Sequence, residues 1–321
     1  MLFAYRLDGQ RLARQGPDAP LADAVWVDLY RPQPEQAARV LAELGVEVPS
    51  LEDMKEIEIS NRLYREGGSD VMTVVLPGAR PDGGQVSGPV TFVLTPERLV
   101  TVRHHAPRPF ETFPTRADRS TTGCGTHLRL FLGLVEEIIA RQADLMEAAG
   151  RGLDAIAARV YAGNSEPLTP EELEGALRSV GREGEVVARV RLALLTIERM
   201  LSVFTLWVAD RGEGQGLKGH VKSMLRDIQA LEEHADFLGG RVGLATDTTL
   251  GMVNLSQNAS VRMMSVVAAL FLPPTLIASI YGMNFAVIPE LGWRLGYPMS
   301  LGLMVVSAVL TWAWFRWRGW L

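Results

Sequence analysis

The chain has 321 residues, and its 37 acidic side chains exceed its 32 basic ones, which gives a formal net charge of −5. This acidic balance argues against a nucleic-acid-binding protein and is compatible with divalent cations as partners. The single cysteine, Cys124, excludes an intrachain disulfide, and neither it nor the five histidines show the spacing of metal ligands.

Short runs typical of strands fill the first hundred residues and enclose one helical stretch. Strands are predicted over residues 1–7, 24–29, 70–76, 90–94 and 99–103. Residues 95–98, Thr-Pro-Glu-Arg, predict a hairpin turn between the last two strands. Residues 34–44 predict a helix, because apolar residues recur there at positions i, i+3, i+4 and i+7. The sequence therefore predicts a small α/β domain over residues 1–120.

Long helical patterns follow the short strands. Helices are predicted over residues 126–162 and 169–210, and the second opens on a capping box with proline at its first position, Thr169-Pro170-Glu171-Glu172. The glycine-rich residues 212–216 end the second helix. We therefore expect an antiparallel helical hairpin within residues 121–216.

A single very long helix is predicted over residues 217–281, because nothing strong enough to stop it appears before Pro273. At about 1.5 Å per residue, this stalk helix is roughly 95 Å long. Its soluble half cannot bury its apolar face alone, so it needs partner helices.

The C-terminal part contains two apolar runs without a charged residue. Residues 263–281 and 297–315 each hold 19 residues, enough to cross the ~30 Å hydrocarbon core of a bilayer. The alternative is a pair of buried helices in a soluble protein. The complete absence of charge and the flanking Arg262, Arg316 and Arg318 favour two transmembrane helices.

Both termini are expected to face the cytosol. The basic residues that flank the spans, including those of the tail 316–321, lie on one side of the membrane, whereas the connection 282–296 carries one Arg and one Glu. The first residues lack the charged and apolar stretches of a signal peptide. Five of the seven tryptophans lie in the last 29 residues, where an aromatic belt anchors the second span. These features predict a multi-pass protein of the bacterial cytoplasmic (inner) membrane with a short external loop.

The tetrapeptide Tyr281-Gly282-Met283-Asn284 lies between the two spans. It matches the Gly-Met-Asn signature of the CorA family of magnesium and cobalt channels. Further segments match the family pattern on both sides of it: Phe271-Leu272-Pro273-Pro274-Thr275, Pro289-Glu290-Leu291-Gly292-Trp293, Gly296-Tyr297-Pro298 and Trp320-Leu321. The chain resembles this family over essentially its whole length.

The resemblance implies the fold class. It is that of an α+β membrane protein with an N-terminal cytoplasmic α/β domain, a long helical stalk and two C-terminal transmembrane helices. CorA proteins are funnel-shaped pentamers in which the long helix forms the central stalk and continues into the membrane as the pore wall. The resemblance therefore implies a homopentamer here.

One face of the first span carries an uncharged stripe. Its members recur every three or four residues: Asn258, Val261, Ser265, Ala268, Leu272, Thr275 and Ser279. Small and hydroxylated residues on such a face can simply let membrane helices pack closely. The resemblance instead implies a pore lining, in which Asn258, Thr275 and Asn284 match polar pore positions. It also implies that Val261, Met264 and Leu272 match the apolar constrictions.

The resemblance places the outer selectivity site at Gly282, Met283 and Asn284. Mg²⁺ sheds water reluctantly, so carboxamide oxygens that accept hydrogen bonds from its coordinated waters suit conduction better than carboxylates that would trap it. Gly282 is expected to let the backbone turn at the helix end, where a positive φ would make glycine necessary, and Met283 is expected to brace the loop. Glu290 is the one acid of the external loop, and it either concentrates cations there or is a solvated charge or a partner of Arg294.

A regulatory metal site is suggested on the stalk. Residues 225–228, Leu-Arg-Asp-Ile, resemble the segment that holds an inter-subunit metal in some relatives, with Asp227 as the candidate ligand and Asp82 of the α/β domain as its candidate partner. A surface salt bridge at Asp227 is the alternative. Mg²⁺ would thus be both the transported and the regulatory ion, and no organic cofactor is expected.

The favoured function is gated conduction of hydrated Mg²⁺, with Co²⁺ or Ni²⁺ as surrogates, closed by intracellular Mg²⁺. A zinc transporter of the ZntB type on the same fold and a membrane-anchored helical scaffold without transport are the alternatives. An enzyme or an ATP-driven pump is not expected, because the sequence has no Gly-x-x-x-x-Gly-Lys-Ser/Thr loop and no evident pair of nucleophile and base.

Overall fold

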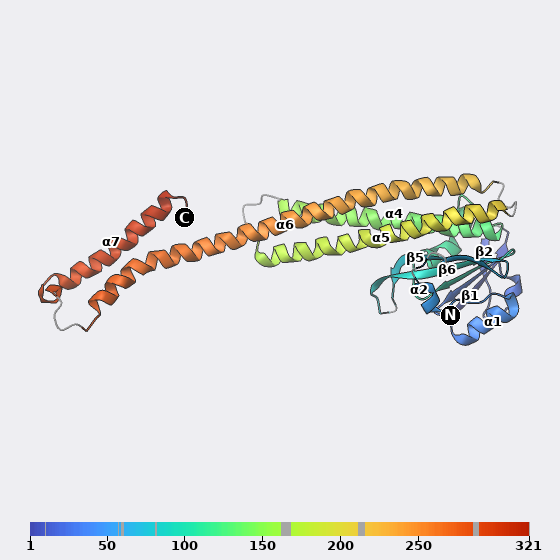
Figure 1. Ribbon diagram of the computed structural model, residues 1–321, viewed down its shortest axis with the longest axis horizontal. Coiled ribbons are helices and arrows are strands. Elements are labelled where there is room, and N and C mark those ends of the chain that lie inside the picture. The colour runs from blue at the N-terminus through green and yellow to red at the C-terminus, as the bar shows by residue number, and fades with distance from the viewer. Residues whose placement is uncertain are drawn as a thin grey trace. The chain divides into compact units, whose positions relative to one another are not determined.

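The computed structural model describes residues 1–9, 11–56, 58, 61–80, 82–161, 168–210, 216–284 and 289–320. The chain divides into two compact units (Figure 1). The first comprises Met1–Ala162 and Arg178–Thr246, and the second comprises Gly163–Leu177 and Asp247–Leu321. The finer division into six segments that the sequence suggests stays a prediction.

A mixed sheet forms the N-terminal part of the first unit. Over the described residues its seven strands lie in the order β2-β1-β3-β7-β6-β5-β4. The strands are β1 (Leu2–Asp8), β2 (Arg11–Arg14), β3 (Trp26–Tyr30), β4 (Leu63–Glu66), β5 (Ser69–Ala79), β6 (Gln85–Leu94) and β7 (Leu99–Arg103). β3 and β7 pair in parallel, and the other neighbouring strands pair antiparallel.

The sequence predicts five of these strands. β2 and β4 were missed because each has only four residues, Arg-Leu-Ala-Arg and Leu-Tyr-Arg-Glu, too few to establish a period. The predicted hairpin turn at residues 95–98 is confirmed. The Thr95 amide donates to the Arg98 carbonyl at 3.0 Å, and the Thr95 hydroxyl accepts from the Arg98 amide at 3.1 Å.

Short helices accompany the sheet. They are α1 (Pro34–Leu44), α2 (Leu51–Lys55) and α3 (Pro109–Thr112), with 3₁₀ turns at Leu21–Asp23, Phe113–Thr115 and Ala117–Arg119. α1 has the predicted bounds, since Pro34 occupies its first position and Gly45 ends it in the left-handed conformation. α2 was not predicted, although Ser50 and Asp53 form a capping box at its start.

Three long helices complete the first unit: α4 (His127–Tyr161), α5 (Pro170–Asp210) from Arg178 onward, and the first part of α6 (Lys218–Tyr281). The predicted helices agree with these bounds to within a residue. An aromatic series joins sheet and helices, with ring centroids 5.5 Å apart between Phe92 and Phe131 and 5.0 Å apart between Phe131 and Phe204. The Arg191 guanidinium on α5 lies 2.7 Å from the Asp236 carboxylate on α6. The predicted turn of the helical hairpin, residues 163–168, lies outside the described residues except for Leu168.

Three of the described helices, α5, α6 and α7 (Gly296–Trp317), are long and apolar enough to cross a membrane by length and composition. The apolar window of α5 is 44% buried inside the structure, against 6% for α6 and 11% for α7. Met200, Leu201 and Phe204 of α5 already lie in the core of the first unit. α5 therefore buries its apolar face within the protein, whereas α6 and α7 leave theirs for lipid or partner chains.

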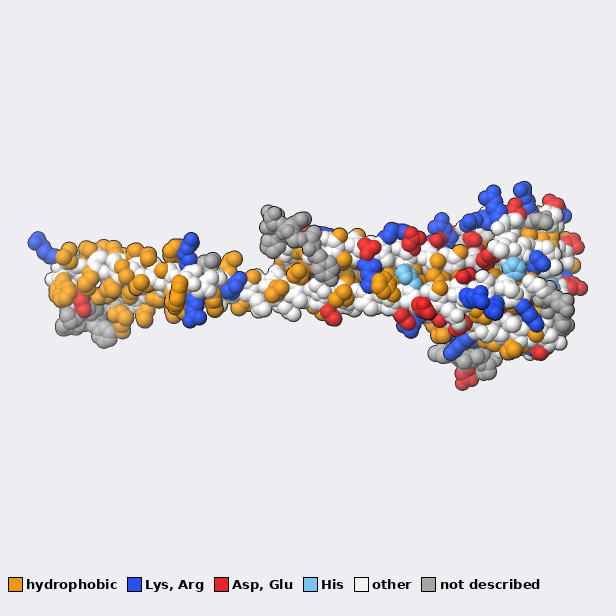
Figure 2. Space-filling view, turned by 90° about the horizontal axis from the view of Figure 1, so that it is seen from above, with side chains coloured by type: hydrophobic (Ala, Val, Ile, Leu, Met, Phe, Trp, Pro, Cys, Tyr) orange, Lys and Arg blue, Asp and Glu red, His pale blue; other side chains and the backbone are white. Residues whose placement is uncertain are grey.

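The two apolar spans belong to the second unit. Figure 1 shows α7 running back beside the last part of α6, and in Figure 2 hydrophobic side chains dominate this end of the chain. α6 continues through Pro273 and Pro274. Prolines lack an amide hydrogen, so the carbonyls of Ala269 and Leu270 lose their usual helical donors.

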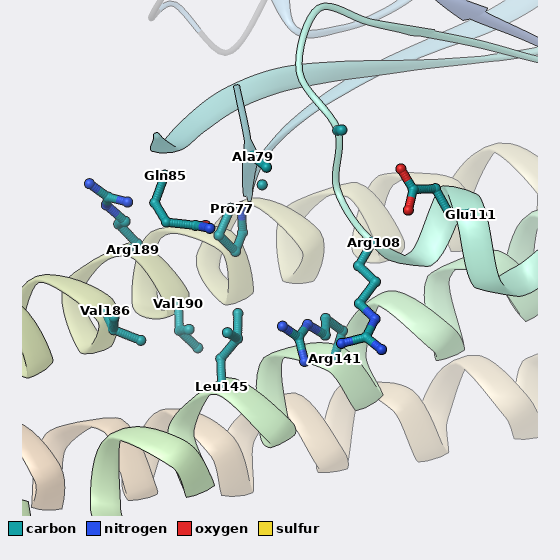
Figure 3. Close-up of a pocket in the computed structure, with 12 residues that line it drawn as sticks. Pro77, Ala79, Gln85, Arg108, Glu111, Arg141, Leu145, Val186, Arg189 and Val190 are labelled. Carbon is teal, nitrogen blue, oxygen red and sulfur yellow. The ribbon is translucent and has the colours of Figure 1, made fainter. Parts of the chain in front are cut away.

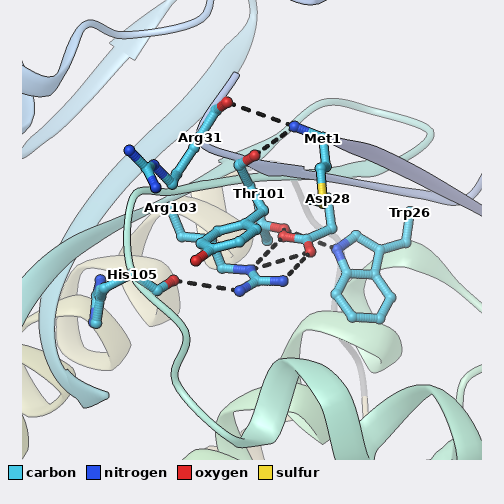
Figure 4. A network of polar contacts seen from close by, with 8 residues as sticks. Met1, Trp26, Asp28, Arg31, Thr101, Arg103 and His105 are labelled. Carbon is cyan, nitrogen blue, oxygen red and sulfur yellow. Dashed lines mark hydrogen bonds and ion pairs between the residues drawn. The ribbon is translucent and has the colours of Figure 1, made fainter. Parts of the chain in front are cut away.

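A buried ion pair fastens the parallel strands β3 and β7 together (Figure 4). The Arg103 Nη2 atom lies 2.9 Å from the Asp28 Oδ2 atom, and the two residues are 4% and 1% exposed. The Thr101 hydroxyl donates to Asp28 at 2.8 Å and accepts from the Trp26 indole at 3.0 Å. The pair's polar atoms are thus satisfied, which is the condition under which a charge tolerates burial.

His105 is expected to make the stability of the first unit depend on pH. Its ring is 4% exposed and its Nε2 atom donates to the Leu76 carbonyl at 2.8 Å, and burial lowers the pKa of His105 to about 4. The unfolded chain, with a histidine pKa of about 6.5, then binds the proton more tightly, so stability falls by about 3 kcal/mol as the pH falls from 6.5 to 4. Thermal unfolding midpoints at pH 7, 6 and 5 should fall less steeply for His105→Gln than for the wild type. Parallel pH curves for the two proteins would contradict this role.

Candidate functional site

The uncharged stripe predicted from the sequence lies on a single face of α6. All of its members are exposed in the isolated chain: Asn258, Val261, Ser265, Ala268, Leu272, Thr275 and Ser279. Val261 is 63% exposed, Leu272 is 73% exposed and the neighbouring Met264 is 75% exposed. Side chains this apolar need lipid or further protein to cover them.

The opposite face of α6 is covered. Val266 is buried, and Leu270, Pro273 and Ile277, which share its face at helical spacing, are half-buried. Figure 1 shows α7 running beside this part of α6, and Ser300 and Phe315 of α7 are buried in turn. The stripe lies opposite the covered positions of α6, on the face that another copy of α6 could approach.

Two hydroxyl groups of the stripe use their hydrogens within the helix. The Ser265 hydroxyl donates to the Val261 carbonyl at 2.9 Å, and the Thr275 hydroxyl donates to the Phe271 carbonyl at 2.6 Å. The hydroxyl oxygens then face outward as acceptors. An acceptor surface suits a cation that keeps its water shell, because coordinated waters are donors.

The Gly-Met-Asn segment follows directly on the end of α6. Asn284 is exposed and makes no hydrogen bond within the described part of the chain, so its carboxamide is available. Gly282 does not adopt the positive φ that would make glycine necessary, because it is not among the residues with left-handed backbone. A Cβ there would lie 3.0 Å from the Ala278 carbonyl oxygen, so a larger residue would have to shift this contact by a few tenths of an ångström.

The predicted external loop is described apart from residues 285–288. A 3₁₀ turn, Pro289–Gly292, leads into α7, and no ion pair joins Glu290 to Arg294 in the structure. Gly296, for which the sequence suggested no role, is required by packing. A Cβ at Gly296 would lie 2.3 Å from the Glu290 carbonyl oxygen, so any other residue must displace the loop.

The candidate regulatory residues are not part of a metal cluster within the described chain. Asp227 is exposed on α6, and Asp82 lies in the β5–β6 turn, where its Oδ1 atom accepts from the Gly84 amide at 3.0 Å. No group of three or more His, Cys, Asp or Glu side chains that could hold a metal occurs among the described residues.

Comparison with known proteins identifies the family to which the chain belongs. The model of the family described as CorA-like Mg2+ transporter protein matches residues 22–317. The magnesium transport protein CorA of Sodalis glossinidius (strain morsitans) is 32% identical over 325 residues, covering 100% of both chains.

Solved structures agree on the fold. The complete CorA magnesium transporter from Methanocaldococcus jannaschii has a TM-score of 0.70 at 16% identity and covers 100% of this chain and 99% of that one. The ZntB cytoplasmic domain from Vibrio parahaemolyticus RIMD 2210633 is more distant, with a TM-score of 0.51 at 11% identity over 78% of this chain and 96% of that one. The family model and the full-length relative together show that this chain belongs to the CorA-like Mg2+ transporter proteins.

Proposed function

We propose that this chain is a gated channel that conducts hydrated Mg²⁺, and also Co²⁺ or Ni²⁺, across the cytoplasmic membrane. The observation that carries the proposal is the uncharged, exposed stripe on α6, which lies opposite the covered face of this helix and is followed by the exposed Asn284. Copies of this stripe arranged around an axis would enclose a pathway lined by acceptors and apolar side chains. Such a lining holds a hydrated cation weakly enough to release it.

The assembly that we propose is a homopentamer. The large exposed apolar surface of α6 and the need of the acceptor stripe for facing copies support self-association. Five copies of Asn284 would then surround the outer mouth of the pathway and bind the ion through its coordinated waters. Met283 is half exposed beside Asn284, where contact with a neighbouring copy would brace the loop.

Both termini are proposed to face the cytosol. Arg316 and Arg318 follow the second span, and their guanidinium groups lie 5.4 Å from the ring centres of Trp312 and Trp314. Stacked arginine and tryptophan side chains suit the membrane interface, and basic residues favour its cytosolic side.

Liposome flux tests the proposal. The purified protein would be reconstituted around an indicator for each ion, and the initial uptake of Mg²⁺, Co²⁺, Ni²⁺ and Zn²⁺ compared with and without a pH gradient. Mg²⁺ uptake independent of the proton gradient is expected. Zinc uptake that follows protons would instead favour a transporter of the ZntB type, and no flux of any ion would favour a scaffold.

Apolar side chains on or beside the stripe are proposed to form the gate. Val261, Met264 and Leu272 would make narrow rings that lose water and block a hydrated ion. Leu272→Gly should therefore raise the closed-state leak several-fold in bilayer recordings at high internal Mg²⁺. Ala268→Gly, on the same face but without a large side chain to remove, is the control. A closed-state conductance unchanged by Leu272→Gly would place the constriction elsewhere.

Feedback by intracellular Mg²⁺ is proposed to act through Asp227. The first 262 residues carry a formal net charge of −7, so assembly brings acidic surfaces together, and a bridging cation relieves their repulsion. Mg²⁺ would bind the closed assembly more tightly than a loosened one and so shut the channel. Asp227→Ala should stay active at internal Mg²⁺ concentrations that close the wild type. An unchanged inhibition curve would mean that other acids regulate the channel.

A further inference from the structure

A cleft of about 380 Å³ in the first unit gathers arginines from three separate parts of the chain (Figure 3). Arg108 lies directly before α3, Arg141 lies on α4 and Arg189 lies on α5. The chain as a whole is acidic, with a net charge of −5, whereas this group of arginines is locally positive. A local positive field in an acidic protein attracts anions.

The positive charges of the cleft are incompletely paired. Within the described part of the chain, Arg108 has no carboxylate within ion-pair distance, and Arg141 reaches only the exposed Asp144, at 3.7 Å. Figure 3 shows the Arg108 and Arg141 side chains near one another at one end of the cleft. Two guanidinium groups in this arrangement repel each other unless an anion joins them. Arg189 contributes less, because it pairs with Glu185 on its own helix.

A neighbouring hollow extends the basic surface. It shares Arg108 and Arg141 with the cleft and adds Arg116. Two carboxylates also line it. Glu137 is already engaged, accepting from Arg116 at 3.2 Å and from the Thr112 hydroxyl at 2.8 Å, and Asp144 is the exposed partner of Arg141 at 3.7 Å. Among the described residues, neither carboxylate forms an ion pair with Arg108.

The other side of the cleft is apolar. Leu145 of α4 and Val186 and Val190 of α5 face it, and Pro77 and Gln85 close it from the sheet (Figure 3). One acid, Glu111 on α3, also lines the cleft, but its carboxylate lies apart from the Arg108 and Arg141 guanidinium groups in Figure 3. The cleft thus has two arginine side chains at one end and an apolar wall on its other side.

We propose that this cleft binds a phosphate-bearing organic anion such as a nucleotide. The phosphate would bridge Arg108 and Arg141, since guanidinium groups match phosphate oxygens in paired hydrogen bonds. The apolar part of the ligand would lie against Leu145 and Val190. This assignment concerns the first unit alone and does not depend on the ion that the protein transports.

Calorimetric titration of the full-length protein in detergent, with EDTA present, tests the assignment. ATP should bind saturably, pyrophosphate more weakly, and adenosine not at all. Arg108→Gln and Arg141→Gln should each weaken ATP binding by about tenfold or more, the loss expected for a charge-assisted hydrogen bond. Arg151→Gln, on the same helix as Arg141 but paired with Glu147, is the matched control and should bind as the wild type does.

Several outcomes would overturn the assignment. The first is an absence of saturable ATP binding, and the second is an ATP affinity of both cleft variants that equals that of the wild type. The others are adenosine or pyrophosphate binding as tight as that of ATP. Competition by stoichiometric phosphatidylglycerol in mixed micelles would identify the anion as a lipid headgroup instead of a soluble ligand. Equal elution volumes for the wild type and all variants would show that the exposed substitutions leave the fold intact.

Discussion

Replacing Asn284 with alanine is expected to reduce Mg²⁺ uptake to the level of empty liposomes while leaving the assembly intact. Asn284 is exposed at the end of α6 and has no hydrogen-bond partner among the described residues, so its removal breaks no hydrogen bond in that part of the chain. What is lost is the ring of carboxamide oxygens that would accept hydrogen bonds from the ion's water shell. The initial rate of Mg²⁺ uptake tests the loss of transport. The elution volume, measured on the same preparation, tests whether the assembly is intact.

Ser307→Ala on α7 is the matched control for this substitution. The Ser307 hydroxyl donates to the Met304 carbonyl at 2.8 Å within its own helix and is half-buried, so it offers nothing to a conducted ion. Its uptake should equal that of the wild type. Normal uptake by an assembled Asn284→Ala protein would remove Asn284 from the selectivity site.

Local sequence signals predicted the elements that depend on neighbours along the chain. Helical spacing, a proline and a glycine gave α1 its bounds, and the absence of charge over residues 263–281 and 297–315 identified the spans. The same spacing placed the stripe on one face of α6, and the structure confirms that this face is exposed. Whether the face lines a pore depends on other copies, which one sequence cannot supply.

Features that depend on residues far apart were missed. Asp28 pairs with Arg103 across 75 positions of sequence, and the one available signal was a carboxylate inside the apolar run Trp26–Tyr30. The arginine cleft likewise joins three distant segments. The backbone conformation of Gly282 could not be predicted, because residue type alone does not distinguish a positive φ from the close approach of a carbonyl.

Replacing Arg103 with methionine is expected to lower the opening free energy of β3 and β7 by about 3–5 kcal/mol. The substitution keeps an apolar stem but leaves the Asp28 carboxylate buried without its counter-charge, which is the costly way to break a buried pair. It also removes the guanidinium that lies 4.6 Å from the Tyr30 ring centre and 5.0 Å from the Phe110 ring centre. Hydrogen exchange of the β3 and β7 amides in the full-length protein should then be roughly 10²–10⁴ times faster.

The double variant Asp28→Leu with Arg103→Met separates the loss of the pair from the loss of one partner. With both charges removed, no uncompensated carboxylate remains, and apolar replacements of buried ion pairs are often neutral or stabilising. Hydrogen exchange in the double variant should return most of the way to the wild-type rate. It should not return fully, because the Thr101 hydroxyl loses Asp28 as its hydrogen-bond acceptor. If the double variant exchanges as fast as Arg103→Met, the loss comes from packing around Tyr30 and Phe110 and not from the stranded charge. If neither variant changes the exchange rate, the ion pair does not hold the parallel strands together.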